Sequence, residues 1–411
     1  MKLRGNCIIA QSGGPTAVIN SSVAGVFNEA LLHSEIEGIY ASYNGILGIL
    51  EEKIFDLRKE EKNLIEGLIY TPSAALGSCR YKIKNDEEVK KILKIFEKYN
   101  IRYFFYIGGN DSMDTANKIY ELAKLKNYDI RVIGIPKTID NDLFGTDHSP
   151  GYGSVIKYLA TITMETAKDT ESLHTFDTIS VIEVMGRNAG WIAAGTSLAK
   201  RSEEDGPHII LFPEIPFQRE RFKVKILETI KKYKYCVIVV SEGVKNPDGS
   251  YISEQKNELG KDSFGHIQLG GAGLFIKNLI ESDLKIKTRF VIPSISQRVG
   301  IHFASKTDSD EAYEAGRKAV EKACDGLSGY MISFERVSNN PYKIKYNHIE
   351  LKEVANNEKF FPKEWITEDG FFVKKEFTDY ALPLIQGEVP IKIINGLPYF
   401  VRLKKEFIKK L

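Results

Sequence analysis

An apolar run leads into a charged loop in the stretch Arg131-Val132-Ile133-Gly134-Ile135-Pro136-Lys137-Thr138-Ile139-Asp140-Asn141-Asp142. The run is typical of a buried strand, and ligands of parallel α/β folds bind at the carboxyl ends of strands. Phosphoryl transfer needs a cation near the spread negative charge, a carboxylate that accepts the acceptor's proton and another that positions Mg²⁺. The loop supplies all three, although a polar connection with Thr and Asp bonded to turn amides would have the same composition.

Apolar runs alternate with amphipathic stretches along most of the chain. Strands are expected at residues 7–10, 36–41, 103–107, 132–135, 179–185, 209–212, 236–240 and 290–292. Helices are expected at residues 17–32, 86–98, 112–124, 155–168, 189–199, 220–233, 272–281 and 308–323. This repetition predicts an α/β fold with mainly parallel sheets flanked by helices. Residues 329–350 have the pattern of a hairpin that turns at Asn339-Asn340-Pro341, and the tail from about residue 352 is too apolar to be disordered.

Length and composition limit the class of protein. The 411 residues exceed one ordinary domain. A net charge of +2 gives no electrostatic case for nucleic acid or an acidic membrane surface. The four cysteines form no CxxC pair, which argues against a disulfide framework or a zinc site and favours a reducing cytoplasm. The chain has no run of 18 apolar residues and no secretory pattern at its start, so a cytoplasmic location is expected.

Two glycine turns follow expected strands, at Gly13-Gly14 and at Gly108-Gly109. Small residues there let backbone N–H groups approach a phosphate near a helix N-terminus. A Gly-Gly turn between a strand and a helix is common, and Asp111 or Ser112 could simply cap the following helix. Each turn alone is therefore a weak signal.

Two arginines accompany these turns. Arg80 closes the segment Leu76-Gly77-Ser78-Cys79-Arg80, and Arg187 lies in Glu183-Val184-Met185-Gly186-Arg187-Asn188-Ala189-Gly190-Trp191 after an expected strand. The planar guanidinium fork suits tetrahedral oxyanions. An ordinary surface salt bridge would account equally well for Arg80.

Together, in this order and spacing, these segments resemble the phosphofructokinase family over about residues 5–330. The resemblance implies phosphoryl transfer to the 1-hydroxyl of fructose 6-phosphate, with two Rossmann-like domains. Residues 1–152, completed by about 297–325, would bind the phosphoryl donor, residues 153–296 would bind the sugar phosphate, and residues 326–411 would form a hairpin and an extension packed on the core.

The resemblance also implies residue roles. Asp140 matches the general base and Thr138 its polar partner, with Lys137 and Arg187 completing the catalytic set. The implied fructose 6-phosphate contacts are Thr138, Asp140, Met185, Gly186, Arg187, Glu242, Arg289 and Arg298. Arg289 would reach across from a neighbouring subunit, which implies a homodimer or homotetramer with sites at the subunit interface.

Three departures from the family pattern stand in the sugar region. Thr178 replaces another cross-subunit arginine, and Ile295 replaces a histidine of bacterial ATP enzymes. His266 imitates that histidine but lies upstream of Arg289, and is interpreted as a loop or helix-start residue.

Two positions favour pyrophosphate as the donor. ATP-using relatives have glycines where this chain has Asp111 and Lys137, and the present pair resembles the pyrophosphate-dependent branch. A carboxylate at 111 would repel a nucleotide phosphate by about 4 kcal/mol at 4 Å and an effective dielectric near 20. The implied pyrophosphate contacts are Gly13, Gly14, Arg80, Gly109, Asp111 and Lys137. Mg²⁺ is expected at Asp111 and Asp142, since Asn110 is a weaker ligand than the aspartate of many relatives.

Other functions fit parts of the pattern. An ATP-dependent phosphofructokinase, a sedoheptulose 7-phosphate kinase or a non-catalytic sugar-phosphate sensor would share the fold. Asp111 and Lys137 argue against ATP, and the retained Asp140 argues against a sensor. No residue excludes the longer sugar.

Overall fold

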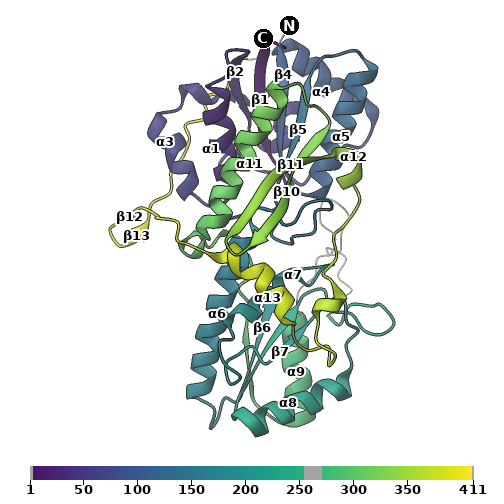
Figure 1. Ribbon diagram of the computed structural model, residues 1–411, viewed down its shortest axis with the longest axis vertical. Coiled ribbons are helices and arrows are strands. Elements are labelled where there is room, and N and C mark those ends of the chain that lie inside the picture. Colours follow the sequence, from purple (N-terminus) through teal and green to yellow (C-terminus); the bar gives the residue numbers. More distant parts are fainter. Residues whose placement is uncertain (1–2, 254–270, 410–411) are drawn as a thin grey trace. The chain divides into compact units, whose positions relative to one another are not determined.

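The computed structural model describes residues 3–253 and 271–409 (Figure 1). The chain forms two compact units. The first contains residues 1–154, 298–359 and 387–411, and the second contains residues 155–297 and 360–386. The C-terminal part, expected to be one extension, is therefore divided between the two units. His266 lies outside the described residues.

The first unit is built on a seven-stranded sheet in the order β11-β10-β5-β4-β1-β2-β3. Its strands are β1 (Gly5–Gln11), β2 (Ile36–Ser42), β3 (Ile54–Asp56), β4 (Ile101–Gly108), β5 (Arg131–Pro136), β10 (Tyr330–Asn339) and β11 (Tyr342–Glu350). β1 pairs in parallel with β2 and β4, and β5 lies parallel to β4 and β10. The predicted hairpin is confirmed as β10 and β11, which pair antiparallel and extend the sheet at one edge.

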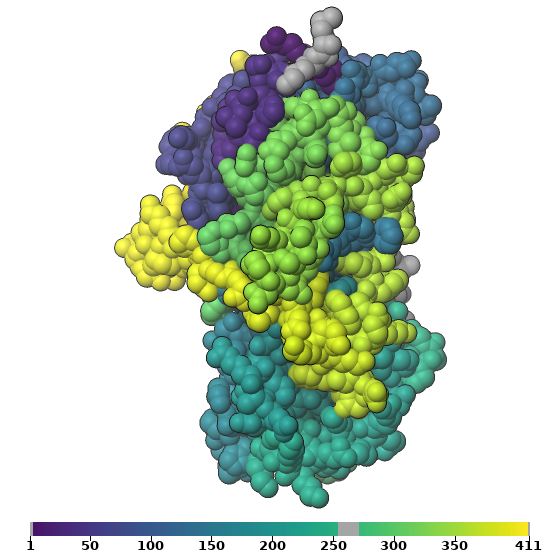
Figure 2. Space-filling model, in the orientation of Figure 1, coloured from purple at the N-terminus to yellow at the C-terminus, as the bar shows by residue number. Residues whose placement is uncertain are grey.

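Helices cover both faces of this sheet. They are α1 (Ile19–Ala30), α2 (Gly45–Leu50), α3 (Lys62–Gly67), α4 (Asp86–Lys98), α5 (Asn110–Leu125), α11 (Lys306–Cys324) and α12 (Leu351–Val354). Successive side chains of a strand point to opposite faces, so β1 serves two cores. Cys7 and Ile9 pack with residues of α1 and α11, whereas Ile8 and Ala10 pack with residues of α4 and α5. Figure 2 shows α11 and the hairpin, in green, at the surface of this unit.

The second unit has a four-stranded parallel sheet in the order β7-β8-β6-β9. Its strands are β6 (Ile179–Val184), β7 (Ile209–Leu211), β8 (Cys236–Ser241) and β9 (Thr288–Val291). Its helices are α6 (Tyr152–Ser172, which begins in the first unit), α7 (Trp191–Gly195), α8 (Arg219–Tyr233), α9 (Ala272–Leu284) and α13 (Lys375–Ala381), with the short α10 (Ser296–Val299) at the boundary. Every residue of β6 and β8 is buried, as the continuous apolar runs predicted.

The α/β prediction is confirmed, and the differences are local. The helix expected over 189–199 is a short α7 followed by a 3₁₀ turn at Thr196–Ala199. The short elements β3, α2, α3 and α13 were not predicted, because each is too brief to show a period. Within the two described ranges, every helix is too short or too polar to cross a membrane.

Candidate functional site

The first glycine turn lies between two neighbouring segments of the first unit. The Ser12 amide donates to the Ile107 carbonyl at 2.9 Å, and the Gly13 amide donates to the Cys79 carbonyl at 3.0 Å. Gly13 has φ +78°, in the left-handed region that favours glycine. The helix expected from residue 17 begins only at Ile19, so the turn is fixed by these hydrogen bonds and is not itself a helix N-terminus.

Lys137 reaches this turn from the end of β5. Its ammonium group donates to the Gly14 carbonyl at 2.7 Å, and the side chain is buried. A Cβ on Gly13 would stand 3.1 Å from Lys137 Nζ, so glycine leaves room for the ammonium group. Burial lowers the pKa of Lys137 to about 8, against the opposing effect of the carboxylates Asp140 and Asp142. The Lys137 side chain therefore does not face solvent.

Two arginines lie at the same turn. A Cβ on Gly14 would be 3.3 Å from Arg298 Nη1 and 4.0 Å from Arg80 Nη2. Both arginines also lower the pKa of Lys137 by charge repulsion. Three cations at one glycine turn concentrate positive charge there, which favours the approach of an anion. The turn therefore has the electrostatics of a site for a small, dense anion.

The loop after Lys137 is ordered by its own side chains. The Thr138 amide donates to the Pro150 carbonyl at 3.3 Å, and Thr138 Oγ1 accepts from the Asp140 amide at 3.1 Å. The Thr138 side chain also hydrogen-bonds Asp142, whose pKa burial raises. Asn141 adopts φ +54°, and its Oδ1 accepts from the Ser149 amide at 3.1 Å. Thr138 and Asn141 thus fix the backbone that carries the two aspartates.

The second glycine turn differs at its two positions. A Cβ on Gly108 would lie 2.0 Å from Ser112 Oγ, so this glycine is required by packing. A Cβ on Gly109 would make only an ordinary contact, 3.6 Å from the Lys137 carbonyl oxygen. The N-cap position of α5 is occupied by Gly109, and Asp111 and Ser112 lie inside the first turn of the helix. Neither Asp111 nor Ser112 is therefore the N-cap residue. Asp111 lies half-buried in the first turn of α5.

The second unit brings four of the predicted sugar-phosphate residues together. The Gly186 amide donates to Glu242 Oε1 at 3.3 Å, and Gly186 has φ +125°. A Cβ on Gly243 would stand 1.9 Å from the Arg187 carbonyl oxygen, so the backbone after β8 touches the turn after β6. The Met185 amide donates to Gln297 Oε1 at 3.0 Å. Met185, Gly186, Arg187 and Glu242 therefore form one cluster.

The two arginines predicted for the 6-phosphate belong to different units. Arg298 belongs to the first unit, beside Gly14. Arg289 belongs to the edge strand β9 and is exposed; its Nε donates to Asp177 Oδ2 at 2.8 Å. Lys287 Nζ lies 2.8 Å from the other oxygen of Asp177, and together Lys287 and Arg289 lower the pKa of that carboxyl.

Sequence reasoning missed residues that support these clusters. Gln297 directly precedes Arg298 in the chain, and this neighbourhood was the one sequence feature that could have suggested a role for Gln297. Lys359 lies in the tail to which no role was assigned, yet its ammonium group donates to the Asp147 carbonyl at 2.8 Å behind the Asp140 loop. Burial lowers the pKa of Lys359 to about 7. The tail carried no motif that could have indicated this.

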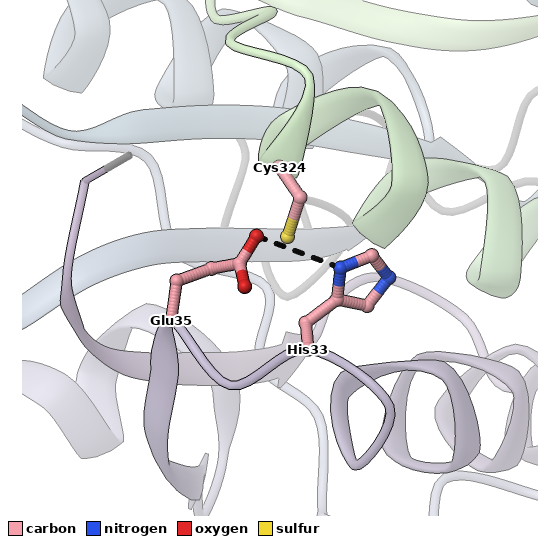
Figure 3. Close-up of side chains that lie close together, drawn as sticks. All are labelled: His33, Glu35 and Cys324. Carbon is pink, nitrogen blue, oxygen red and sulfur yellow. Dashed lines mark ion pairs between the residues drawn. The ribbon is translucent and has the colours of Figure 1, made fainter. Parts of the chain in front are cut away.

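One group of metal-ligating side chains, His33, Glu35 and Cys324, is present among the described residues, with ligand atoms within 4.8 Å of one another. Figure 3 shows the three side chains pointing toward a common centre. His33 Nδ1 lies 3.7 Å from Glu35 Oε1, and Nε2 lies 3.1 Å from Glu29 Oε1. His33 thus contacts both carboxylates, and these contacts account for the closeness of His33 and Glu35 without a metal.

The donor set near Lys137 suits a different metal. Mg²⁺ prefers oxygen ligands and is usually held by one or two carboxylates together with substrate phosphates. Asp111 and Asp142 offer carboxylate oxygens, whereas the Asn110 side chain is already bonded to the backbone of residues 354–357. In donor chemistry alone, the two carboxylates suit a magnesium ion that is shared with a bound phosphate.

Comparison with known proteins gives consistent results. Residues 6–323 match the family model described as phosphofructokinase. A protein of Halomonas elongata named pyrophosphate–fructose 6-phosphate 1-phosphotransferase is 44% identical, covering 98% of this chain and 97% of its own. Crystal structures titled pyrophosphate-dependent phosphofructokinase, from Marinobacter aquaeolei and Nitrosospira multiformis, are 41% and 43% identical. Each matches with a TM-score of 0.91 over 99% of this chain and 98% of its own.

Proposed function

The chain belongs to the phosphofructokinase family, and we propose that it reversibly transfers a phosphoryl group from pyrophosphate to the 1-hydroxyl of fructose 6-phosphate. The products are fructose 1,6-bisphosphate and phosphate. The observation that carries this proposal is the buried ammonium group of Lys137 at the Gly14 carbonyl. Relatives named for the same reaction along nearly their whole length support it.

Asp140 is the general base. Its carboxylate accepts the proton of the sugar 1-hydroxyl, whose oxygen attacks one phosphorus of pyrophosphate while the bridging P–O bond breaks and phosphate leaves. The hydrogen bond from the Asp140 amide to Thr138 Oγ1 holds the loop in position. Lys137 and Arg80 offset the charge on the transferred and leaving groups, because fixed cations stabilise charge that develops in the transition state.

The sugar phosphate is bound by Met185, Gly186, Arg187 and Glu242, with Arg187 also offsetting charge on the phosphoryl group. The contact between Gly186 and Glu242 supports one binding cluster. Arg289 would contact the 6-phosphate of a neighbouring subunit, in exchange for part of its pairing with Asp177. The place of Arg298 beside Gly14 favours a contact with the transferring phosphates over the 6-phosphate contact implied by the resemblance.

Magnesium is the proposed cofactor. When bound, Mg²⁺ neutralises charge on the pyrophosphate oxygens. Asp111 and Asp142 would hold it. Burial raises the pKa of Asp142, because it disfavours the ionised carboxylate. A nearby cation would offset this cost.

The alternatives are less consistent with the site. ATP would bring its nucleoside and α-phosphate toward Asp111, and Lys137 fills the space that a glycine would leave. A non-catalytic sensor is disfavoured because full-length relatives are named phosphotransferases. Sedoheptulose 7-phosphate is the alternative acceptor, since it presents the same 1-hydroxyl.

Assembly and location are also part of the proposal. A homodimer or homotetramer, with sites at the subunit interface, follows from a cross-subunit role for Arg289, whose side chain is exposed on an edge strand. A cytoplasmic location is supported by four free cysteines, three of them buried.

The proposal is tested by following all phosphorus species at once with ³¹P NMR. Fructose 6-phosphate, pyrophosphate and Mg²⁺ should give equal amounts of fructose 1,6-bisphosphate and phosphate, and the two products should regenerate pyrophosphate. Hydrolysis of pyrophosphate to phosphate without sugar phosphorylation, or an unchanged pyrophosphate signal, would refute it.

A further inference from the structure

The side chain of Asn110 is bonded to the C-terminal segment. Its Nδ2 donates to the Asn357 carbonyl at 2.6 Å and to the Val354 carbonyl at 3.2 Å. Its Oδ1 accepts from the Asn356 amide at 2.7 Å. An amide can donate twice and accept at once, whereas an ionised aspartate can only accept. Asparagine is therefore the residue that these three backbone groups require at position 110.

The same segment holds the loop that carries Asp140. Lys359 Nζ donates to the Asp147 carbonyl at 2.8 Å, to the Thr146 carbonyl at 3.1 Å and to Asn141 Oδ1 at 3.3 Å. An ammonium group has three N–H donors, which matches these three acceptors in number. The Lys359 amide also donates to the Asp142 carbonyl at 2.8 Å.

One short segment thus joins two loops that the sequence separates. Asn110 opens α5 beside the second glycine turn, and Asn141 and Asp142 end the charged loop. Both follow neighbouring strands, β4 and β5. Asn110 is the first residue of α5, whereas Asn141 and Asp142 lie outside regular secondary structure. A shift of about 1 Å in a catalytic group can cost about 100-fold in rate.

We infer that Val354–Lys359 is a clasp that holds the donor-binding turn and the catalytic loop in register, and that Lys359 is the positioning residue for Asp140 and Asp142. The clasp also explains why Asn110 stands where many relatives have a metal-binding aspartate: its side chain has a structural role here. This inference rests on the proposed function only for its kinetic readout.

The first test replaces Lys359 with methionine, which keeps the length of the side chain and removes the three donors. We expect kcat to fall by about 100-fold with KM for fructose 6-phosphate within about threefold, because the loop is displaced while the sugar cluster is intact. Lys200→Met is the matched control, since Lys200 Nζ also donates to two backbone carbonyls, of Glu203 and Asp205, but contacts no site residue. An equal loss in the control, or an unchanged kcat in Lys359→Met, would overturn the inference.

Amide hydrogen exchange gives a readout that does not depend on the reaction. In Lys359→Met, exchange should accelerate in residues 138–142, while exchange in β6 and β8 stays unchanged. If the proposed reaction is not observed but exchange still accelerates locally, the result supports the clasp and refutes the proposed function. Uniform acceleration across the protein would show general destabilisation and overturn the positioning role.

Asn110→Asp tests the other end of the clasp. A metal ligand at this position would bind Mg²⁺ more tightly as a carboxylate, whereas a clasp residue would lose two donated hydrogen bonds. We expect kcat to fall at least 10-fold with no decrease in the Mg²⁺ concentration for half-maximal rate. Combined with Lys359→Met, the loss should be smaller than the product of the single losses, because both act on one element. A tighter Mg²⁺ requirement with full activity would contradict the clasp.

Discussion

The ammonium nitrogen of Lys137 lies 2.7 Å from the carbonyl oxygen of Gly14, so the loop after β5 is tied to the turn after β1. Glycine at position 13 makes this contact possible, since a side chain there would crowd the nitrogen. Arg80 and Arg298 lie at the same turn. The arrangement concentrates positive charge at one turn, which favours the binding of a compact anion.

Lys137→Met should lower kcat/KM for pyrophosphate by about 100- to 1000-fold, as the loss of a preorganised charge in a transition-state site usually does. KM for fructose 6-phosphate should change little, because the sugar cluster belongs to the second unit. Initial rates with each substrate varied in turn measure both effects. A variant in which only KM for fructose 6-phosphate increases would contradict the donor role of Lys137.

The pH dependence follows from the lowered pKa of Lys137, about 8 in the folded protein. The folded enzyme holds its charged, anion-binding form below this pH and loses the proton above it, so kcat/KM for pyrophosphate should fall on the alkaline side near pH 8. Lys137→Arg keeps its charge at every accessible pH. That variant, although slower, should lack the alkaline limb; an identical limb would assign the titration to another group.

Asp140→Asn should bind both substrates and lose turnover by about 100- to 10,000-fold, since an amide cannot accept the proton. Equilibrium binding of fructose 6-phosphate and single-turnover rates separate the two effects. Asp379→Asn is a suitable control, because Asp379 lies on α13 and forms a surface ion pair with Lys375. Near-normal turnover in Asp140→Asn would exclude it as the base.

A buried ion pair outside the site predicts how stability depends on pH. His148 lies between Asp147 and Glu311, at 2.7 and 2.6 Å. Burial disfavours the charged ring, but the two carboxylates outweigh it and raise the pKa of His148 to about 9. Because the folded pKa exceeds the unfolded value near 6.5, the stabilisation is complete below pH 6.5 and is lost as the pH rises through about 9.

His148→Gln should therefore cost about 3 kcal/mol of unfolding free energy at pH 6. It removes the cation between Asp147 and Glu311, while Arg336 still pairs with Asp147 and Tyr342 still donates to Glu311. The difference from the parent should shrink toward pH 9.5. Denaturant unfolding at several pH values measures it. A difference independent of pH would show that packing, and not charge, supplies the contribution of His148.

The sequence was most informative where a local pattern carries the chemistry. Lys137, Thr138, Asp140 and Asp142 are adjacent in the chain, and the glycine turns follow recognisable strands. Strand and helix positions followed from periodicity because the long elements have buried faces. The roles of these residues as base, metal ligand and phosphate contact stay predictions.

Long-range contacts left no such pattern. Asn110 bonds to residues about 246 positions away, and Lys359 reaches back across more than 200 positions. Such polar contacts follow no sequence period. The alternating pattern of a strand also does not indicate which strand it pairs with, so the pairing of β10 with β5 was not predicted. The position of Arg298 beside Gly14 likewise depends on tertiary structure.

The most direct test of the account compares initial rates with pyrophosphate and with ATP, using fructose 6-phosphate and Mg²⁺ in one preparation. The buried Lys137 and the Asp111 carboxylate predict turnover with pyrophosphate and none with ATP above the background of a Lys137→Met sample. Turnover with ATP alone would contradict the assignment of the donor site.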